Sequence, residues 1–188
     1  MNRIKSMAKV YLSLFLLVPF WSFADSVPDE TFQKVAEEFE VPAVVLYAVA
    51  CAESAKRGTT EEGNRPWPWT LTIAGERRHY PTREAAQAAL DHFLELGISN
   101  IGVGLMQVNW RRFQDFLGDP SRALDPVSNL RIGAGILRNQ WNQEEDLWLA
   151  IGHYHSASPT DAGDFKYHVG AEVVRLLSQQ PRFRIPNG

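Results

Sequence analysis

The chain has 188 residues, of which 45% are hydrophobic and 22% are charged, which is the composition of an ordinary globular protein with a substantial core. Its formal net charge is −3. A mildly acidic chain is a poor candidate for nonspecific nucleic-acid binding, so we expect no nucleic-acid partner.

Residues 1–24 have the three sections of a secretory signal peptide. Three basic residues and no acidic one come first, an apolar run of about 14 residues follows, and small residues lead up to Ala24. The run contains Pro19 and is too short for a comfortable membrane span, so an uncleaved anchor is the less favoured alternative. We expect cleavage before Asp25 and export to the periplasm, which leaves 16 basic and 22 acidic residues in the mature domain, 25–188.

Two helices are predicted next. Apolar residues at positions i, i+3, i+4 and i+7 indicate an amphipathic helix; they are Phe32, Val35, Ala36 and Phe39. Pro42 begins a second helix that is apolar on every side from Ala43 to Ala52, which predicts a central, buried position. Lys56 and Gly58 favour its end there. Cys51 is the only cysteine, so an intrachain disulfide is excluded. Because it lies in the apolar run, we expect it to pack in the core.

The remaining chain is predicted to be mostly helical. Residues 59–68 are polar with two prolines and indicate a loop, and a short β-hairpin is predicted over Thr70–Tyr80 around Gly75. Helices are expected at 82–97, in a short segment ending at Gly118, and at 126–141, 146–155 and 164–178. The sequence therefore predicts a single α-dominated (α+β) domain with a small β-hairpin.

Glu53 is the first candidate for chemistry because it follows a wholly apolar helical stretch. Desolvation disfavours a charged carboxylate, so burial is expected to favour the protonated form that a general acid requires. The alternative is an exposed carboxylate paired with Lys56 or Arg57.

A second candidate is the segment from Gly102 to Asn109, GVGLMQVN. Its glycines permit tight turns and close approach of a ligand, and the amides of Gln107 and Asn109 suit sugar hydroxyls and N-acetyl groups. The alternative is a simple junction between a loop and a helix. A phosphate loop is not favoured because the Lys-Ser/Thr ending is missing.

The third candidate is the segment AIGHYHS, residues 150–156. His153 and His155 are two positions apart, so on a helix they do not face each other, and no HExxH pattern accompanies them. We therefore expect no metal. Tyr154 is interpreted as an aromatic of the core or of a cleft, with a useful hydroxyl.

Four segments in order resemble the soluble lytic transglycosylases, a goose-type lysozyme-like family. They are Glu53-Ser54, GLMQVN at 104–109, Asn129-Leu130 with Gly133 and Leu137, and Ala150 with Tyr154-His155. The resemblance implies a lysozyme-like fold, a peptidoglycan glycan strand as substrate, no cofactor and Glu53 as the catalytic acid/base. It implies substrate-binding or cleft-shaping roles for Ser54, Ser99, Met106, Gln107, Asn109, Asn129, Tyr154 and His155. His155 stands where many relatives have Asn.

The chain departs from the common pattern of this family in one respect. About 50 residues separate Glu-Ser from GLMQ, where the pattern has a short stretch. The additional segment, about 59–98, is similar to the insert of small specialised members that accompany conjugation or secretion machinery, so such machinery is an expected partner of this otherwise monomeric enzyme. Trp67, Trp69 and Tyr80 are interpreted as a small core under the hairpin; the alternative is stacking on sugars.

The number of carboxylates favours one reaction. Ordinary glycosidases use two carboxyl groups, whereas the matching segments supply only Glu53; Glu61, Glu62 and Asp115 lie in no matching segment. The resemblance implies a lytic transglycosylase that cleaves the β-1,4 bond between N-acetylmuramic acid and N-acetylglucosamine and leaves 1,6-anhydromuramic ends. The alternatives are a hydrolysing muramidase and a non-catalytic wall-binding subunit of an envelope-spanning machine.

Overall fold

A computed structural model describes residues 29–56 and 65–179 of the chain. The predicted signal peptide and residues 59–64 of the predicted loop lie outside these ranges. None of the described helices is long and apolar enough to cross a membrane.

The predicted predominance of helices is confirmed. The described residues form eight helices, namely α1 (Asp29–Glu38), α2 (Ala43–Ser54), α3 (Arg83–Glu95), α4 (Trp110–Leu117), α5 (Pro120–Ala123), α6 (Pro126–Glu144), α7 (Leu147–His155) and α8 (Pro159–Gln179). Two differ clearly from the prediction. The short helix α5 was not predicted, and α8 begins five residues before Asp164, where Pro159 occupies a first-turn position that suits proline.

The predicted hairpin is part of a larger antiparallel sheet. Strands β1 (Thr70–Ile73) and β2 (Glu76–His79) form the hairpin, and β3 (Ile101–Val103) and β4 (Val108–Asn109) extend it in the order β2-β1-β3-β4. Leu71 is paired with Val103, which in turn is paired with Val108. The glycine-rich segment between residues 102 and 109 therefore belongs to the sheet, although glycine weakens a strand's intrinsic signal.

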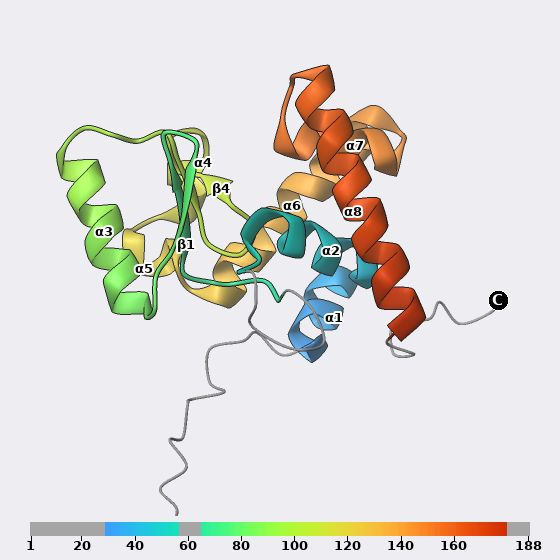
Figure 1. Ribbon diagram of the computed structural model, residues 1–188, viewed down its shortest axis with the longest axis horizontal. Coiled ribbons are helices and arrows are strands. Elements are labelled where there is room, and N and C mark those ends of the chain that lie inside the picture. The colour runs from blue at the N-terminus through green and yellow to red at the C-terminus, as the bar shows by residue number, and fades with distance from the viewer. Residues whose placement is uncertain (1–28, 57–64, 180–188) are drawn as a thin grey trace, which may run out of the picture.

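The sheet and the C-terminal helices lie on opposite sides of α2 (Figure 1). The sheet lies with α3, α4 and α5 on one side, and α7 and α8 lie on the other. Helix α2 packs against α1 and α8, while α6 packs against α1 and α7. This central position explains why α2 has to be apolar on every side, and it places the C-terminal end of α2 beside both halves of the molecule.

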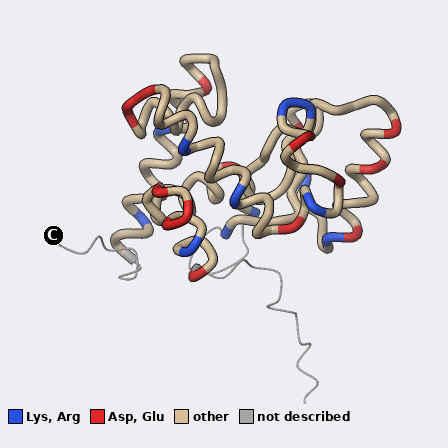
Figure 2. Tube along the Cα trace, turned by 180° about the vertical axis from the view of Figure 1, so that it is seen from behind, with Lys and Arg blue, Asp and Glu red and all other residues tan. Residues whose placement is uncertain are grey.

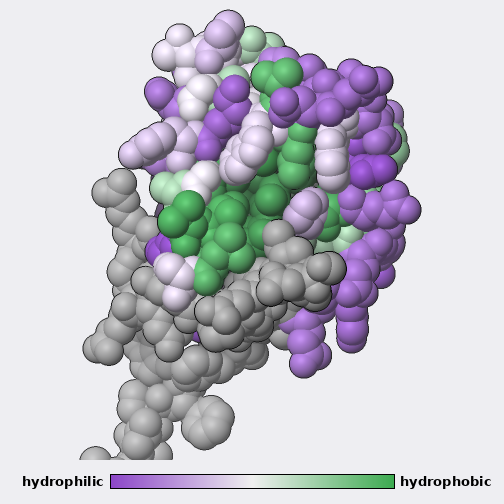
Figure 3. Space-filling view, turned by 90° about the vertical axis from the view of Figure 1, so that its right-hand side faces the viewer, coloured by the Kyte–Doolittle hydropathy of each residue, from purple (hydrophilic) through white to green (hydrophobic). Residues whose placement is uncertain are grey.

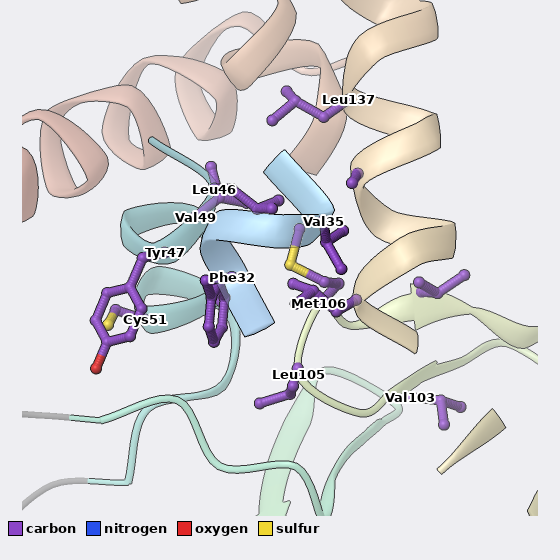
Figure 4. Close-up of a cluster of buried hydrophobic side chains, with 14 of the residues drawn as sticks. Phe32, Val35, Leu46, Tyr47, Val49, Cys51, Val103, Leu105, Met106 and Leu137 are labelled. Carbon is purple, nitrogen blue, oxygen red and sulfur yellow. The ribbon is translucent and has the colours of Figure 1, made fainter. Parts of the chain in front are cut away.

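The core extends from α1 and α2 to the turn between β3 and β4 (Figure 4). Phe32 and Val35 of α1 and Leu46 of α2 are almost completely buried, as is Met106 of the turn. Cys51 is also buried, as predicted.

The described residues include charges of both signs and an exposed apolar area. Lysine and arginine are interspersed with aspartate and glutamate along the described trace (Figure 2). The face on the right-hand side of Figure 1 carries an apolar area bordered by hydrophilic residues (Figure 3). Helix α8 has two strongly exposed large apolar side chains, Tyr167 and Val174.

Candidate active site

The C-terminal end of α2 carries Glu53 and is held by the predicted insert. Helix ends leave backbone carbonyls without partners. Here Arg77 donates to the carbonyl of Ala52 at 3.3 Å, and the backbone N–H of Trp67 donates to that of Ser54 at 3.3 Å. His79 Nε2 lies 3.2 Å from the same Ser54 oxygen. Burial is the main cause that lowers the pKa of His79, and the neutral ring donates to this oxygen. Helix α2 thus ends at Ser54, two residues before Lys56.

The aromatic residues of the insert form the small core favoured by the sequence. The rings of Trp67 and Trp69 meet edge to face at 5.4 Å between centroids, and Trp67 Nε1 donates to the carbonyl of Tyr80 at 2.7 Å. None of the three lines the cleft described next. They stabilise the hairpin that holds the end of α2.

A cleft of about 560 Å³ lies at this end of α2. Its walls come from α2, the sheet, α4, α6 and α7. Five of the predicted site residues line it: Glu53, Gln107, Asn109, Tyr154 and His155. Residues 102 positions apart in the chain therefore meet in one cavity.

Glu53, the predicted acid, makes a polar contact with His155 in the cleft. His155 Nδ1 lies 3.0 Å from Glu53 Oε1. The glutamate side chain is only 6% exposed, so it is buried, as expected. Arg57, the alternative partner considered from the sequence, lies outside the described residues. The hydrogen bond and charge of Glu53 raise the pKa of His155 above its ordinary value, although burial and Arg77 oppose the shift.

Tyr154 connects α7 with the turn between β3 and β4. Its hydroxyl donates to the backbone carbonyl of Met106 at 2.6 Å. Burial, reinforced by the charge of Glu53, raises the pKa of Tyr154 well above its usual value, so the phenol stays protonated and remains a donor.

The amides of Gln107 and Asn109 are partly used within the protein. Gln107 has a positive φ of 47°, and its Nε2 donates to the carbonyls of Thr70 and Gly104 at 3.1 and 2.8 Å. Its Oε1 accepts from the hydroxyl of Thr72 at 2.6 Å. Asn109 Oδ1 accepts the N–H of Arg112 and caps α4. These amides shape the cleft wall, and each carbonyl oxygen has a second lone pair for a ligand.

The other four predicted residues lie outside the cleft lining. Ser54 is buried and donates to Ala50 O at 2.9 Å. Met106 packs in the core against Gly133: a Cβ added to Gly133 would lie 2.4 Å from the Cβ of Met106. Ser99 accepts a hydrogen bond from Arg111 at 3.0 Å.

The last of these, Asn129, is completely buried at the start of α6. Its side-chain amide donates to the carbonyls of Val103 and Ala123 and accepts the N–H of Met106. It therefore holds the turn that carries Gln107, and its contribution to the cleft is through the backbone of that turn.

Sequence reasoning missed several cleft residues. They are Thr72, Arg77, Asn100, Arg112, Phe113 and Ile136. Arg77 lies on the hairpin, and only the pairing of that hairpin with β3 brings it to the cleft. Asn100 and Arg112 flank the GVGLMQVN segment, so their proximity to it in the chain was an available signal.

His153 belongs to a different environment from His155. Its Nδ1 lies 2.6 Å from Glu144 Oε1, outside the cleft lining. Within residues 29–56 and 65–179, no group of three or more His, Cys, Asp or Glu side chains is arranged to hold a metal ion.

Comparison with known proteins gives one match. The sequence model of the family described as "Transglycosylase SLT domain" matches residues 30–169. Neither a curated protein nor a solved structure matches the chain. The matched range includes all the cleft residues named above.

Proposed function

The chain belongs to the transglycosylase SLT domain family, a family of enzymes acting on peptidoglycan, and we propose that Glu53 is its single catalytic acid/base. The observation that carries this proposal is that Glu53 is the one carboxylate among the described residues that line the cleft. It is buried, yet it borders a cavity large enough for part of a glycan strand.

The proposed reaction needs only this carboxyl. Glu53 donates its proton to the glycosidic oxygen between N-acetylmuramic acid and N-acetylglucosamine, and the bond from that oxygen to C1 breaks. The carboxylate then takes the proton from the muramic acid C6 hydroxyl, whose oxygen bonds to C1 and closes a 1,6-anhydro ring. No water is consumed, and the nucleophile is already held beside C1, which favours the step entropically.

A hydrolysing muramidase is the alternative within the same cleft. Glycosidases that hydrolyse with two carboxyl groups hold them about 5 to 9.5 Å apart. Asp115 is exposed on α4 and does not line the cleft, while Glu61 and Glu62 lie outside the described residues. These three are therefore the residues to test as a second carboxyl.

The charge of the cleft supports a substrate that carries carboxylates. Arg77 and Arg112 both line it, although the mature chain is acidic overall. The peptide stems of peptidoglycan carry carboxylates, and N-acetylmuramic acid without a stem carries one on its lactyl group; guanidinium groups bind both well. We therefore propose that these two arginines bind carboxylates of the glycan strand.

Replacement of single carboxyls tests the proposal. Glu53→Gln keeps the size of the side chain and removes the transferable proton, so release of soluble fragments from purified sacculi should fall at least 1,000-fold, of the order expected for a lost acid/base. Asp115→Asn and the pair Glu61→Gln with Glu62→Gln should retain activity. Unchanged turnover by Glu53→Gln would contradict the enzymatic role and favour a non-catalytic wall-binding subunit.

The cellular setting is proposed from the sequence alone. The signal-peptide pattern supports action in the periplasm, and the insert's resemblance supports service to a conjugation or secretion machine. Fractionation of the expressed full chain, with N-terminal sequencing of the mature protein, should find it in the periplasm beginning at Asp25. A cytoplasmic full-length product would contradict the proposed location.

A further inference from the structure

His155 lies between two cavities. It ends α7 and lines the cleft with Glu53, and it also lines a second cavity of about 510 Å³ beside α8. Its ring stacks on Phe165 of α8 at 4.3 Å between centroids and an interplanar angle of 3°. The His155 side chain is 36% exposed, against 6% for Glu53. The imidazole therefore connects a buried carboxylate with a more open space.

Charged groups from three elements face this imidazole. Glu53 lies on α2, Arg77 on β2 and Asp161 on α8. Glu53 and Asp161 raise the pKa of His155, whereas burial and Arg77 lower it, and the sum is a raised pKa. The other titratable groups that line the second cavity are Cys51, Asp164, His168 and Glu172.

We propose that His155 is a positioning residue that shares one dissociable proton with Glu53 and links this proton to solvent through the second cavity. The inference rests on the proposed role of Glu53. A glycan that filled the cleft would leave the second cavity, which His155 and Phe165 also line, as a route for proton exchange.

The proposed reaction is compatible with a single shared proton. Glu53 gives its proton to the leaving oxygen and regains one from the C6 hydroxyl, so a complete cycle neither consumes nor releases a proton. When the cleft is empty, the proton resides on His155 Nδ1 or Glu53 Oε1, which are 3.0 Å apart. The Glu53–His155 pair can begin the reaction as long as it holds this proton. A carboxyl without a histidine partner would lose the proton at lower pH.

The pH dependence of kcat/KM on solubilised peptidoglycan tests the proposal. His155→Asn and His155→Gln offer a hydrogen-bond donor that does not titrate. Both should move the alkaline limb of the profile to lower pH by about one to two units, since the reference values of His and Glu differ by about two. His153→Asn removes a histidine that is also paired with a glutamate but lies outside the cleft lining, and it should leave the limb in place.

A merely structural role for His155 predicts a different result. Both variants would then lower kcat at every pH without moving the alkaline limb, and that outcome would overturn the proposal. Loss of activity in Glu53→Gln together with an unmoved limb in His155→Asn would reject only the role of His155. Retained activity in Glu53→Gln would reject the proposed function itself.

A titration by NMR tests the shared proton without any activity assay and without altering His155. In the full mature chain, the imidazole of His155 should titrate at higher pH in the wild type than in Glu53→Gln, because the substitution removes the charge that stabilises the imidazolium. His153, which lies outside the cleft lining, serves as the internal control: its signals should not differ between the two proteins. Equal midpoints for His155 in the two proteins would overturn the proposal.

Discussion

The side chain of Asn129 accepts the backbone N–H of Met106 at 2.9 Å, which joins the first turn of α6 to the turn between β3 and β4. The same amide donates to Val103 O at 2.9 Å and to Ala123 O at 3.0 Å. Gly104, with a φ of 78°, leaves the space that this amide occupies, since a Cβ there would lie 2.5 Å from Asn129 Nδ2. One buried side chain thus fixes the backbone that presents Gln107 to the cleft.

Asn129→Ala should destabilise the protein by about 2–4 kcal/mol, because it leaves buried backbone groups without partners and opens a void. Urea unfolding followed by circular dichroism measures the change. Asn139→Ala, on the exposed face of the same helix, should change stability by less than about 0.5 kcal/mol. Equal stabilities for the two variants would show that the Asn129 hydrogen bonds do not hold the turn.

Gly133→Ala tests the packing of the same turn against α6. The added Cβ would lie 2.4 Å from Met106 Cβ, so one of the two segments has to move. Overpacking of this kind typically destabilises by about 1–3 kcal/mol. The shift of the turn should also lower activity.

Gly163→Ala is the matched control for this prediction. Gly163 lies in α8, and a Cβ there meets nothing within 4 Å. The substitution should leave stability unchanged or raise it by about 0.4–1 kcal/mol. Thermal unfolding of both variants distinguishes a packing effect from a general effect of replacing glycine, and a Gly133→Ala variant as stable as the wild type would contradict the close contact.

Local patterns predicted the elements whose residues are close in the chain. The spacing from Phe32 to Phe39 predicted α1. The helix predicted at 126–141 is α6, and Asp125 caps it by accepting the N–H of Ser128 at 2.8 Å. The pairing of Leu71 with Val103 was beyond local patterns because it joins segments 32 residues apart. The contact of His155 with Glu53 depends on the packing of α2 and α7 around the cleft, which no spacing specifies.

The resemblance to a family identified the cleft segments but not how each side chain acts. It placed Met106 and Asn129 with the substrate-binding residues, whereas the structure buries both side chains in the core around the turn. Burial is a tertiary property, so two residues of one motif, Met106 and Gln107, can face opposite sides. The sequence motif therefore identifies the turn as a whole and does not tell which of its side chains face the cleft.

Arg112→Ala tests the proposed binding of substrate carboxylates. The guanidinium of Arg112 lies over the ring of Phe113, 5.1 Å from its centroid, at the cleft. Loss of one exposed charged contact should raise the dissociation constant of a peptide-bearing oligosaccharide by about three- to tenfold, with a smaller change for an uncharged oligosaccharide of N-acetylglucosamine. High salt should reduce the difference.

Arg131→Ala serves as the control for this measurement. Arg131 is an exposed residue of α6 that pairs with Glu38 at 2.9 Å, and it does not line the cleft. The dissociation constants of both oligosaccharides should stay unchanged. Equal effects of Arg112→Ala on the charged and the uncharged oligosaccharide would argue against carboxylate recognition at this position.

The central claim is that Glu53 acts alone, first as an acid and then as a base, without water as the nucleophile. Digestion of purified sacculi in ¹⁸O-labelled water, followed by mass spectrometry of the released muropeptides, tests it most directly. We predict 1,6-anhydromuramic ends without ¹⁸O from the wild-type enzyme and no released ends from a folded Glu53→Gln variant. Reducing ends that carry ¹⁸O would show hydrolysis and would contradict the claim.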